Sequence, residues 1–380
     1  MNFVKHYKLK IKSLSPIHIG TGDCYEPINY VMDRVEDNIK GEKKAAYFLF
    51  SFDETKFYAN LNSVDKQEFT RLVGQTDIKE ILNLQKLIIK NKEIAKKVSI
   101  KRVKVSDEIF NEYIEKIGKA AQKEGGRTSK PKEVLNQLLI QKCYTAPNGK
   151  HQGIVPGSSL KGAISTAYQE MLSKNTNYEK VVKPKLMGAN PDNPFRLFLV
   201  GDSSEARTKI YRTANIKRNL KNDEIKTNSA LSTRLEAIVS SQETEANISI
   251  KQDENGNFLN IKDIITACNN HYMPIFKSMF IDDDAVREVL SDKFYNTYKE
   301  FDSSSLKTNE FLLRIGKHSG ARSVTIDGIR DIKVYHGKKI GYKSEKEETT
   351  AWLVETGKKD KEMYYNPLGW VLCSIEEVNS

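Results

Sequence analysis

Cysteine is scarce and widely spaced in this sequence. The 380 residues include only Cys24, Cys143, Cys268 and Cys373, and no two of them form a CxxC pair. Zinc sites built on paired cysteines and disulfide frameworks both need cysteines at short, regular spacings. The sequence therefore indicates neither of them, and we expect no metal and no cofactor.

Long hydrophobic runs are also missing. No stretch approaches the roughly 18 apolar residues that a membrane-spanning helix needs. The amino-terminal stretch MNFVKHYKLKIKSLSP carries charges throughout and has no apolar core of the kind found in signal peptides. We therefore expect a cytoplasmic protein without a membrane partner.

Acidic residues are outnumbered by basic ones. The chain has 61 Lys and Arg residues against 50 Asp and Glu residues, which is a formal net charge of +11. An excess of positive charge favours a polyanionic partner such as nucleic acid. Many basic proteins bind no nucleic acid, however, so charge alone indicates a class of partner without deciding it.

Apolar periodicity in the first half predicts both strands and helices. Apolar residues alternate with lysines at 7–11, which predicts a strand with a basic outer face, and a second strand follows at 45–52. Helical spacing of apolar residues marks three further segments: 77–98, 107–121 and a short one around 134–140. We interpret residues 53–142 as a helical insertion between strands. Several lysines of this block are interpreted as a solvated face: Lys96, Lys97 and Lys101.

The second half continues this mixture. Helices are predicted at 158–172, 261–280 and 282–301. Strands are predicted in five segments: 196–204, 207–218, 234–250, 311–315, and a terminal hairpin formed by 349–355 and 369–377. Residues 175–194 are rich in turn-forming residues and predict a loop. Strands and helices interleave without a regular repeat, which favours the α+β class.

Three loops combine glycines with a histidine or a lysine and are the candidate binding segments: residues 15–23, 155–162 and 316–320. In the second loop, Ser158 or Ser159 is a natural N-cap for the helix that follows, and Lys161 lies in its first turn. Free amides, a helix amino terminus and a lysine together can bind a phosphate. A Walker A motif is excluded because Lys161 precedes Gly162 instead of following it. A well-capped helix after a glycine turn, without any ligand, stays an open alternative.

The motifs resemble those of the RAMP superfamily of CRISPR proteins. LSPIHIGTGD is similar to the amino-terminal SPxHIGxG signature of that family, and IVPGSSLKGAIST is similar to its IPGSSLKGxxR signature, with Ser165 where arginine is commoner. LLRIGKHSG resembles the RxGxxxG segment, and NPLGWVLC resembles the terminal strand. Motif order and chain length most resemble the fifth subunit of the Csm effector complex of type III-A CRISPR systems.

The resemblance implies a fold, partners and a role. The implied fold is two ferredoxin-like (RRM-like) domains with glycine-rich loops, 1–205 including the helical insertion and 206–380. The implied partners are crRNA, the neighbouring Csm backbone subunit, the small helical subunit and recruited host nucleases. The implied role is to cap the 3′-end side of the effector filament and to support crRNA maturation and antiviral defence, without an active site of its own.

The chemistry of the loop residues and the resemblance to RAMP proteins both predict that the glycine loops bind RNA. Glycine lets the main chain approach a phosphate closely. The predicted RNA-binding residues are His18, Gly20, Gly22, Gly157, Ser158, Ser159, Lys161, Gly316, Lys317, His318 and Arg322. The RNP1 pattern of a free-standing RRM is absent, so base stacking on sheet aromatics is not predicted.

Two alternatives stay open at this point. The chain is an endoribonuclease if His18 and Lys161 supply a general base and acid, or if Asp23 and Asp202 hold magnesium instead of forming turns. It is a purely structural assembly subunit if its positive charge is incidental.

Overall fold

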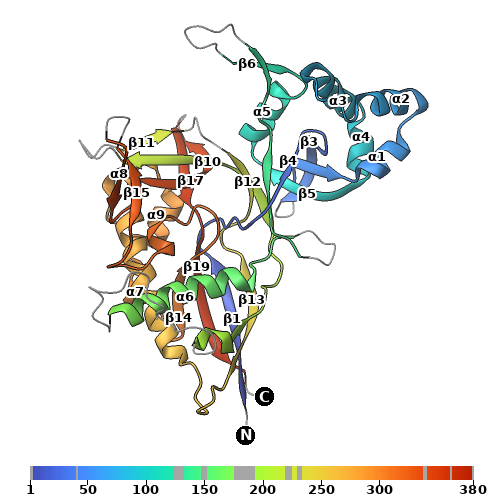
Figure 1. The fold of residues 1–380 in the computed structure, drawn as a ribbon. Coiled ribbons are helices and arrows are strands. Elements are labelled where there is room, and N and C mark those ends of the chain that lie inside the picture. Colours follow the sequence, from blue (N-terminus) through green and yellow to red (C-terminus); the bar gives the residue numbers. More distant parts are fainter. Residues whose placement is uncertain are drawn as a thin grey trace.

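The chain is described by a computed structural model that covers residues 3–39, 42–123, 132–146, 152–174, 193–218, 225–228, 233–336, 340–359 and 362–378. The fold belongs to the α+β class, as predicted, with helices set among several sheets (Figure 1). Within the described residues, no helix is both long and apolar enough to cross a membrane.

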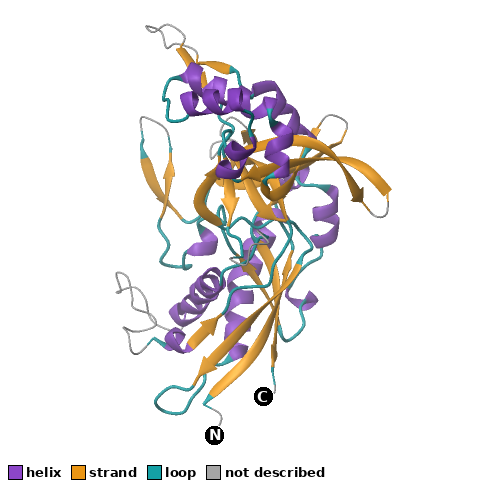
Figure 2. Ribbon diagram, turned by 90° about the vertical axis from the view of Figure 1, so that its right-hand side faces the viewer, coloured by secondary structure: helices purple, strands orange, loops and turns teal. Residues whose placement is uncertain are grey.

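A five-stranded antiparallel sheet brings the two ends of the chain together. Its strand order is β14 (Glu310–Arg314), β19 (Trp370–Glu377), β1 (Val4–Ser13), β13 (Glu243–Lys251) and β9 (Phe198–Val200). The first and last strands of the chain therefore lie side by side (Figures 1 and 2). Because β1 lies between β13 and β19, strand pairing crosses the predicted domain boundary at residue 205, and the division into two domains stays a prediction.

Two long helices, α6 (Gly157–Lys174) and α7 (Ile261–Phe280), contact each other and cover one face of this sheet. Leu9 and Ile11 of β1 are almost fully buried and share one core cluster with helix residues such as Phe276. Burying one such side chain contributes roughly 1.5–3 kcal/mol. The predicted strand at 7–11 and helix at 261–280 are thus confirmed, because their apolar stripes match the faces that are buried.

The other face of the sheet is polar and balanced in charge. The predicted basic outer face of β1 is confirmed, but the neighbouring strands neutralise it. The ammonium of Lys8 lies 2.7 Å from the carboxylate of Glu245 on β13. The ammonium of Lys10 lies 3.1 Å from that of Glu376 on β19. These side chains are 44–51% exposed, so the pairs add little stability, but they remove most of the positive charge of this face.

A larger sheet carries the insertion. Its central strand order is β2 (Gly20–Tyr25), β8 (Ile140–Cys143), β12 (Arg234–Ile238), β10 (Thr208–Arg218), β5 (Ser99–Val105), β4 (Glu42–Phe52) and β3 (Tyr30–Ile39). Three more strands join it through β10: β11 (Ile225–Asn228), β17 (Thr350–Lys359) and β18 (Glu362–Pro367). Two separate hairpins complete the strands: β6 (Ala120–Lys123) with β7 (Lys132–Leu135), and β15 (Ile332–Tyr335) with β16 (Tyr342–Glu345).

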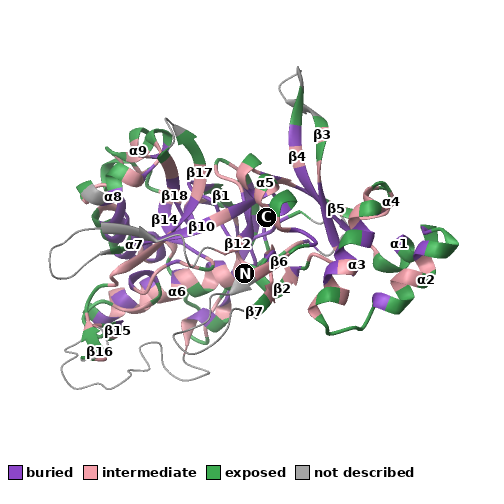
Figure 3. Ribbon diagram, turned by 90° about the horizontal axis from the view of Figure 1, so that it is seen from above, coloured by how far each residue is buried: buried purple, intermediate pink, exposed green. Residues whose placement is uncertain are grey.

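The insertion supplies helices to one end of the molecule. They are α1 (Glu54–Asn60), α2 (Ser63–Leu72), α3 (Ile78–Lys90), α4 (Lys92–Lys97) and α5 (Asp107–Lys116). Seen from above, α1 to α4 lie at one end and α7, α8 (Asp284–Val289) and α9 (Asp292–Tyr298) lie at the other (Figure 3). The insertion also contains β5 to β8, so it is mixed and not purely helical.

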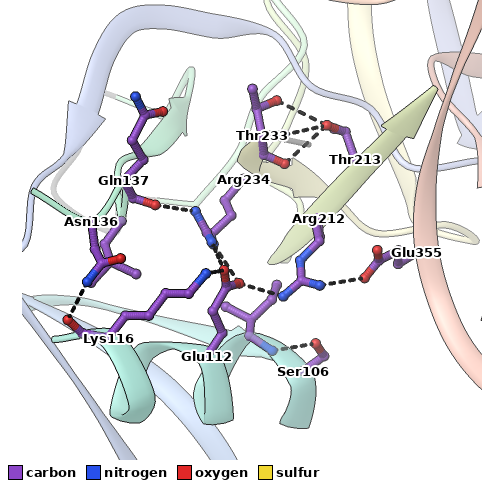
Figure 4. A network of polar contacts seen from close by, with 12 residues as sticks. Ser106, Glu112, Lys116, Asn136, Gln137, Arg212, Thr213, Thr233, Arg234 and Glu355 are labelled. Atoms are coloured by element: carbon purple, nitrogen blue, oxygen red, sulfur yellow. Dashed lines mark hydrogen bonds and ion pairs between the residues drawn. The ribbon is translucent and has the colours of Figure 1, made fainter. Parts of the chain in front are cut away.

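A charged cluster fastens the insertion to the central strands (Figure 4). The Glu112 carboxylate on α5 forms ion pairs with Arg212 of β10, at 2.5 Å, and with Arg234 of β12. Lys116 lies 2.7 Å from it, and Arg212 also approaches Glu355 of β17 at 3.8 Å. Burial alone would raise the pKa of Glu112, but hydrogen bonds from Arg234 and Lys116 outweigh burial and lower the pKa to about 2.

Three predicted elements are wrong. The short helix around 134–140 is instead strand β7, a connection and strand β8, because a short apolar run does not distinguish a buried strand from a helix. The helix at 282–301 is two short helices, α8 and α9, separated by the extended residue Leu290. The terminal hairpin does not form, because β17 pairs with β10 and β18 whereas β19 pairs with β1 and β14.

The remaining helices and strands were located correctly, with shifted ends. The predicted helix at 77–98 is α3 followed by α4, and that at 107–121 is the shorter α5. The predicted strand segments at 45–52, 196–204, 207–218, 234–250 and 311–315 correspond to β4, β9, β10, the pair β12 and β13, and β14. The predicted loop at 175–194 lies almost wholly outside the described residues.

Candidate nucleic-acid interface

The first and third glycine loops are in direct contact. The Lys317 amide donates to the His18 carbonyl oxygen at 2.8 Å. Gly316 has a φ of +86°, and a Cβ at this position would overlap that same carbonyl. Only glycine combines this backbone angle with so close an approach. The two loops, nearly 300 residues apart in the sequence, are therefore held together by a residue that cannot be replaced without strain.

His18 is a structural residue of this contact. Its side chain is 1% exposed, and its Nδ1 lies 2.6 Å from the backbone oxygen of Glu236 on β12. Burial is the main cause of the lowered pKa of His18, and nearby Lys317 adds to it. The imidazole does not reach solvent, so the predicted contact between His18 and RNA does not follow from this geometry.

A buried carboxylate fixes the sheet beneath the first loop. Glu236 is completely buried and accepts hydrogen bonds from Tyr25 Oη at 2.9 Å and Thr208 Oγ1 at 2.5 Å. The Lys101 ammonium lies 2.6 Å from it and is itself only 9% exposed. The interpretation of Lys101 as part of a solvated face is therefore wrong, since the lysine neutralises a charge that would otherwise be buried alone.

The end of the first loop is open. Residues 20–23 are exposed and form the start of strand β2, where the predicted loop continued. Gly22 has a φ of +94°, and nothing lies within 4 Å of the position of an added Cβ. The pairing of β2 with β8 is irregular between Gly20 and Cys24. Exposed main chain is therefore available at Gly20 and Gly22, as predicted.

The second loop begins helix α6 at Gly157, one residue before the predicted caps. The Pro156 carbonyl accepts from the Ser159 amide at 3.0 Å, so the predicted N-cap role of Ser158 or Ser159 is wrong. The Gly157 amide donates to Asp202 Oδ1 at 2.8 Å. This carboxylate occupies the place at the helix amino terminus that we assigned to a phosphate, and it gives Asp202 a structural role.

Gly157 itself is packed against the chain, whereas the residues after it face outward. A Cβ on Gly157 would overlap the carbonyl of Val200 and lie 2.7 Å from that of Gly201. Ser158 is exposed and Ser159 and Lys161 are half-exposed. Burial lowers the pKa of Lys161, and no ion-pair partner lies beside it among the described residues. The second loop thus offers side chains, not the Gly157 amide, to a ligand.

The third loop presents one exposed lysine, which has no ion-pair partner among the described residues, and one stacked ring. Lys317 is exposed, and its ammonium donates to Gln141 Oε1 of β8 at 2.7 Å. His318 has a φ of +67° and stacks on Trp352, with ring centroids 4.4 Å apart. Burial, assisted by Lys317, lowers the pKa of His318 to about 4. His318 is therefore an uncharged ring at neutral pH.

Arginines near the third loop serve the fold. Arg314 is fully buried, donates to the carbonyls of Leu368 at 3.1 Å and His318 at 3.4 Å, and its pKa is lowered to about 10 by burial. Arg322 is 9% exposed and lies 3.2 Å from Glu348. The predicted contact of Arg322 with RNA is thus not supported, because its charge is already paired inside the protein.

Tyr144 joins the first loop to the start of the second, and sequence reasoning missed it. Its amide donates to the Ile19 carbonyl at 2.6 Å, and its own carbonyl accepts from the Ile154 amide at 3.1 Å. This place is called the loop junction below. It is formed by His18, Ile19, Tyr144 and Lys317. The helix predicted around 134–140 ends before Tyr144, and residues 140–144 (IQKCY) show no strict alternation that would have marked a strand here.

Chemical groups for metal-dependent cleavage are not assembled in the described part of the chain. Asp23 is exposed at the open end of the first loop, and Asp202 is bound to the Gly157 amide. Among the described residues, no group of three or more His, Cys, Asp or Glu side chains is placed to hold a metal ion.

Comparison with known proteins gives structural relatives only. No protein-family model matches the sequence. No curated protein matches it either. A chain in a cryo-EM structure of a Csm–crRNA–target RNA ternary complex from a type III-A CRISPR-Cas system has a TM-score of 0.60 and 17% identity, covering 97% of this chain and 100% of that chain. The crystal structure of Csm5 from T. onnurineus has a TM-score of 0.51 and 16% identity, covering 95% and 99%.

This chain has the fold of Csm5. The likeness extends over nearly the whole length of both chains. The expected likeness to the fifth Csm subunit is therefore confirmed at the level of the fold.

Proposed function

We propose that this chain is a non-catalytic RNA-binding subunit of a type III-A CRISPR effector complex, where it caps the 3′-end side of the crRNA. The observation that carries the proposal is the full-length match to a chain of a Csm–crRNA–target RNA complex and to Csm5. The excess of positive charge and the open glycine main chain support it independently.

The RNA-contacting set is smaller than the set expected from sequence. We assign it to the residues that reach solvent: Gly20, Gly22, Ser158, Ser159, Lys161, Lys317 and the half-buried ring of His318. Gly157, Gly316, His18 and Arg322 instead hold the loops in place. A capping subunit needs to bind a single strand of any sequence. Backbone amides and lysines can do this because they contact phosphates and not bases.

A ferredoxin-like core is part of the proposal. Along the chain, β1, α6, β9, β13, α7 and β19 follow one another, and their strands lie in the order β19-β1-β13-β9. With the intervening elements set aside, this order matches the β-α-β-β-α-β arrangement of a ferredoxin-like domain and supports the proposal. The strands around β10, β12, β17 and β18 are then the candidates for the second domain.

The proposed partners follow from the proposed role. They are crRNA, the neighbouring Csm backbone subunit and the small helical subunit, with recruited host nucleases completing crRNA maturation. The proposed place of action is the cytoplasm, in antiviral defence.

The alternative of an endoribonuclease with His18 as general base has less support. A general base must approach the 2′-hydroxyl of RNA within hydrogen-bond distance. The ring of His18 is 1% exposed and its Nδ1 is already bonded to Glu236, so this approach needs the first loop to open.

Crosslinking of the chain to crRNA in the assembled particle tests the proposal. We expect crosslinked nucleotides on the 3′ side alone, because a cap touches one end of the guide. Crosslinks along the whole guide would contradict the capping role, and an absence of crosslinks would favour a purely structural subunit.

Charge reversal tests the same interface in the purified protein. Single-strand binding falls by about 0.7 log unit of affinity per log unit of salt for each phosphate neutralised. Lys161→Glu and Lys317→Glu should each weaken binding and flatten this salt dependence. Lys12→Glu is the matched control, because Lys12 is exposed on the polar face of the five-stranded sheet. Equal loss in all three variants would contradict the assignment.

A further inference from the structure

Tyr144 is an exposed aromatic residue held rigidly at the loop junction. Its side chain is 40% exposed, whereas its backbone is bonded on both sides, to Ile19 at 2.6 Å and to Ile154 at 3.1 Å. Neither its ring nor its hydroxyl has a partner among the described residues. The structure thus holds the backbone of Tyr144 on both sides and leaves its aromatic side chain exposed and outside the core.

Two lysines are associated with strand β8, which directly precedes Tyr144: the Lys317 ammonium donates to Gln141 Oε1 of β8 at 2.7 Å, and Lys142 belongs to β8 itself. The carbonyls of two consecutive residues, His18 and Ile19, accept from the amides of Lys317 and Tyr144 respectively. The first loop therefore binds the backbone of Lys317 at His18 and the backbone of Tyr144 at the next residue, Ile19. Lys142, two positions before Tyr144, places its ammonium 5.1 Å from the ring centre of Tyr25 on the paired strand β2.

No competing aromatic platform is found on the open face of the five-stranded sheet, as far as the described residues show. RRM-type proteins stack bases on aromatic residues of that face. Here Lys8, Lys10, Glu245 and Glu376 pair with one another across the central strands. A base that stacks on this protein needs a ring elsewhere.

We propose that Tyr144 is a stacking subsite for one unpaired nucleobase of bound RNA, beside the phosphate contact made by Lys317. The inference rests on the proposed function and deepens it, because it names the part of the RNA that is recognised. A tyrosine side chain has few rotatable bonds and the backbone of Tyr144 is already held, so stacking on its ring costs little conformational entropy. Every base presents a flat face, so the subsite accepts RNA of any sequence.

Binding of a short, labelled single-stranded RNA to the full-length protein tests this inference, with fluorescence anisotropy as the measurement. Tyr144→Leu keeps an apolar side chain of moderate size but removes the ring, and should weaken binding by about 5- to 100-fold. Tyr144→Trp should bind at least as tightly as the natural chain. The salt dependence should stay unchanged in both variants, because no charge is altered.

Tyr58→Leu is the matched control. Tyr58 is 39% exposed, which is almost the same as Tyr144, but it lies on α1 of the insertion. We expect its substitution to leave RNA affinity unchanged. Thermal unfolding of each variant shows whether the fold is retained, and the aromatic replacement Tyr144→Trp keeps the inference testable if the leucine variant unfolds.

The outcomes separate this inference from the proposed function. Tight, salt-dependent RNA binding that is the same in Tyr144→Leu and the natural chain overturns the subsite and leaves the proposed function standing. Loss of binding in Tyr144→Trp as well as Tyr144→Leu overturns stacking as the reason. Failure of the natural chain to bind RNA overturns both.

Discussion

Two glycines of the PGSSLKG segment have opposite structural roles. Gly157 starts α6 against the carbonyls of Val200 and Gly201, so any side chain there collides with backbone. Gly162 lies within the same helix, is exposed, and has open space where a Cβ would lie. The residue type is the same at both positions. The two roles differ because Gly157 faces backbone carbonyls and Gly162 faces open space.

Alanine substitution of these two glycines should therefore change stability in opposite directions. Gly157→Ala should lower the free energy of unfolding by about 1–3 kcal/mol through overpacking. Gly162→Ala should raise it by about 0.5–1 kcal/mol, because glycine within a helix costs backbone entropy. Urea denaturation of both variants is the measurement. An unchanged or raised stability of Gly157→Ala would contradict the packing described at Gly157, and a lowered stability of Gly162→Ala would contradict the open space at Gly162.

His318 predicts a pH dependence at the residue scale. Its pKa is about 4 in the folded chain, because of burial and Lys317, against about 6.5 when unfolded. Between these values the unfolded chain takes up a proton that the folded chain does not, so stability falls as the pH drops from about 6.5 to 4. His318→Phe keeps a ring on Trp352 without the titrating group.

The loss of thermal stability between about pH 6.5 and 4 should accordingly be smaller in His318→Phe than in the natural chain, by on the order of 1–3 kcal/mol. His18 also has a lowered pKa and stays in both proteins, so some pH dependence remains. Identical pH profiles would show that His318 titrates normally in the folded chain.

At the scale of the elements, Glu112 connects α5 to β10 and β12. Arg212 and Arg234 are only 23% and 11% exposed, so they depend on this carboxylate for neutralisation (Figure 4). Removing one partner of a partly buried charge cluster leaves the others unpaired at low dielectric.

Glu112→Gln should cost about 2–4 kcal/mol of folding free energy at neutral pH. The loss should shrink as the pH falls from about 4.5 to 2, because the pKa of Glu112 is about 2 and its contribution to the natural chain is lost in that range. Glu115→Gln, an exposed position on the same helix, is the control and should change stability by less than about 0.5 kcal/mol. A small effect at Glu112 would mean that solvent already screens the arginines.

At the scale of the whole molecule, the five-stranded sheet depends on the last strand of the chain. β19 lies between β1 and β14, and Trp370 and Val371 at its start are completely buried. A sheet that loses a central strand also loses the pairing of both neighbours and the core beneath them.

A chain that ends at Leu368 should therefore fail to form this sheet, whereas a chain that ends at Glu377 should fold. Amide hydrogen exchange is the measurement, and β1 should lose its protection in the shorter chain. Retained protection of β1 without β19 would show that β13 and the two helices suffice.

The sequence by itself determined the elements whose pattern is local. Periods of two and of 3.6 residues revealed β1, α6 and α7, because each of these buries one continuous face. The resemblance of the glycine motifs to those of RAMP proteins also predicted the likeness to Csm5, which the full-length structural match bears out for the fold.

Only the tertiary structure decided which of the predicted surface and RNA-binding residues are exposed to a ligand. His18, Lys101 and Arg322 are polar residues that a sequence places at the surface, yet each is buried against a partner far away in the chain: Glu236, Glu236 and Glu348. Tyr144 is the reverse case, an aromatic residue left exposed because its strand ends at the loop junction. Periodicity shows which face of its own helix or strand a residue lies on, and nothing more. Burial of a loop residue depends on which distant segments pack over it, and that information is not local.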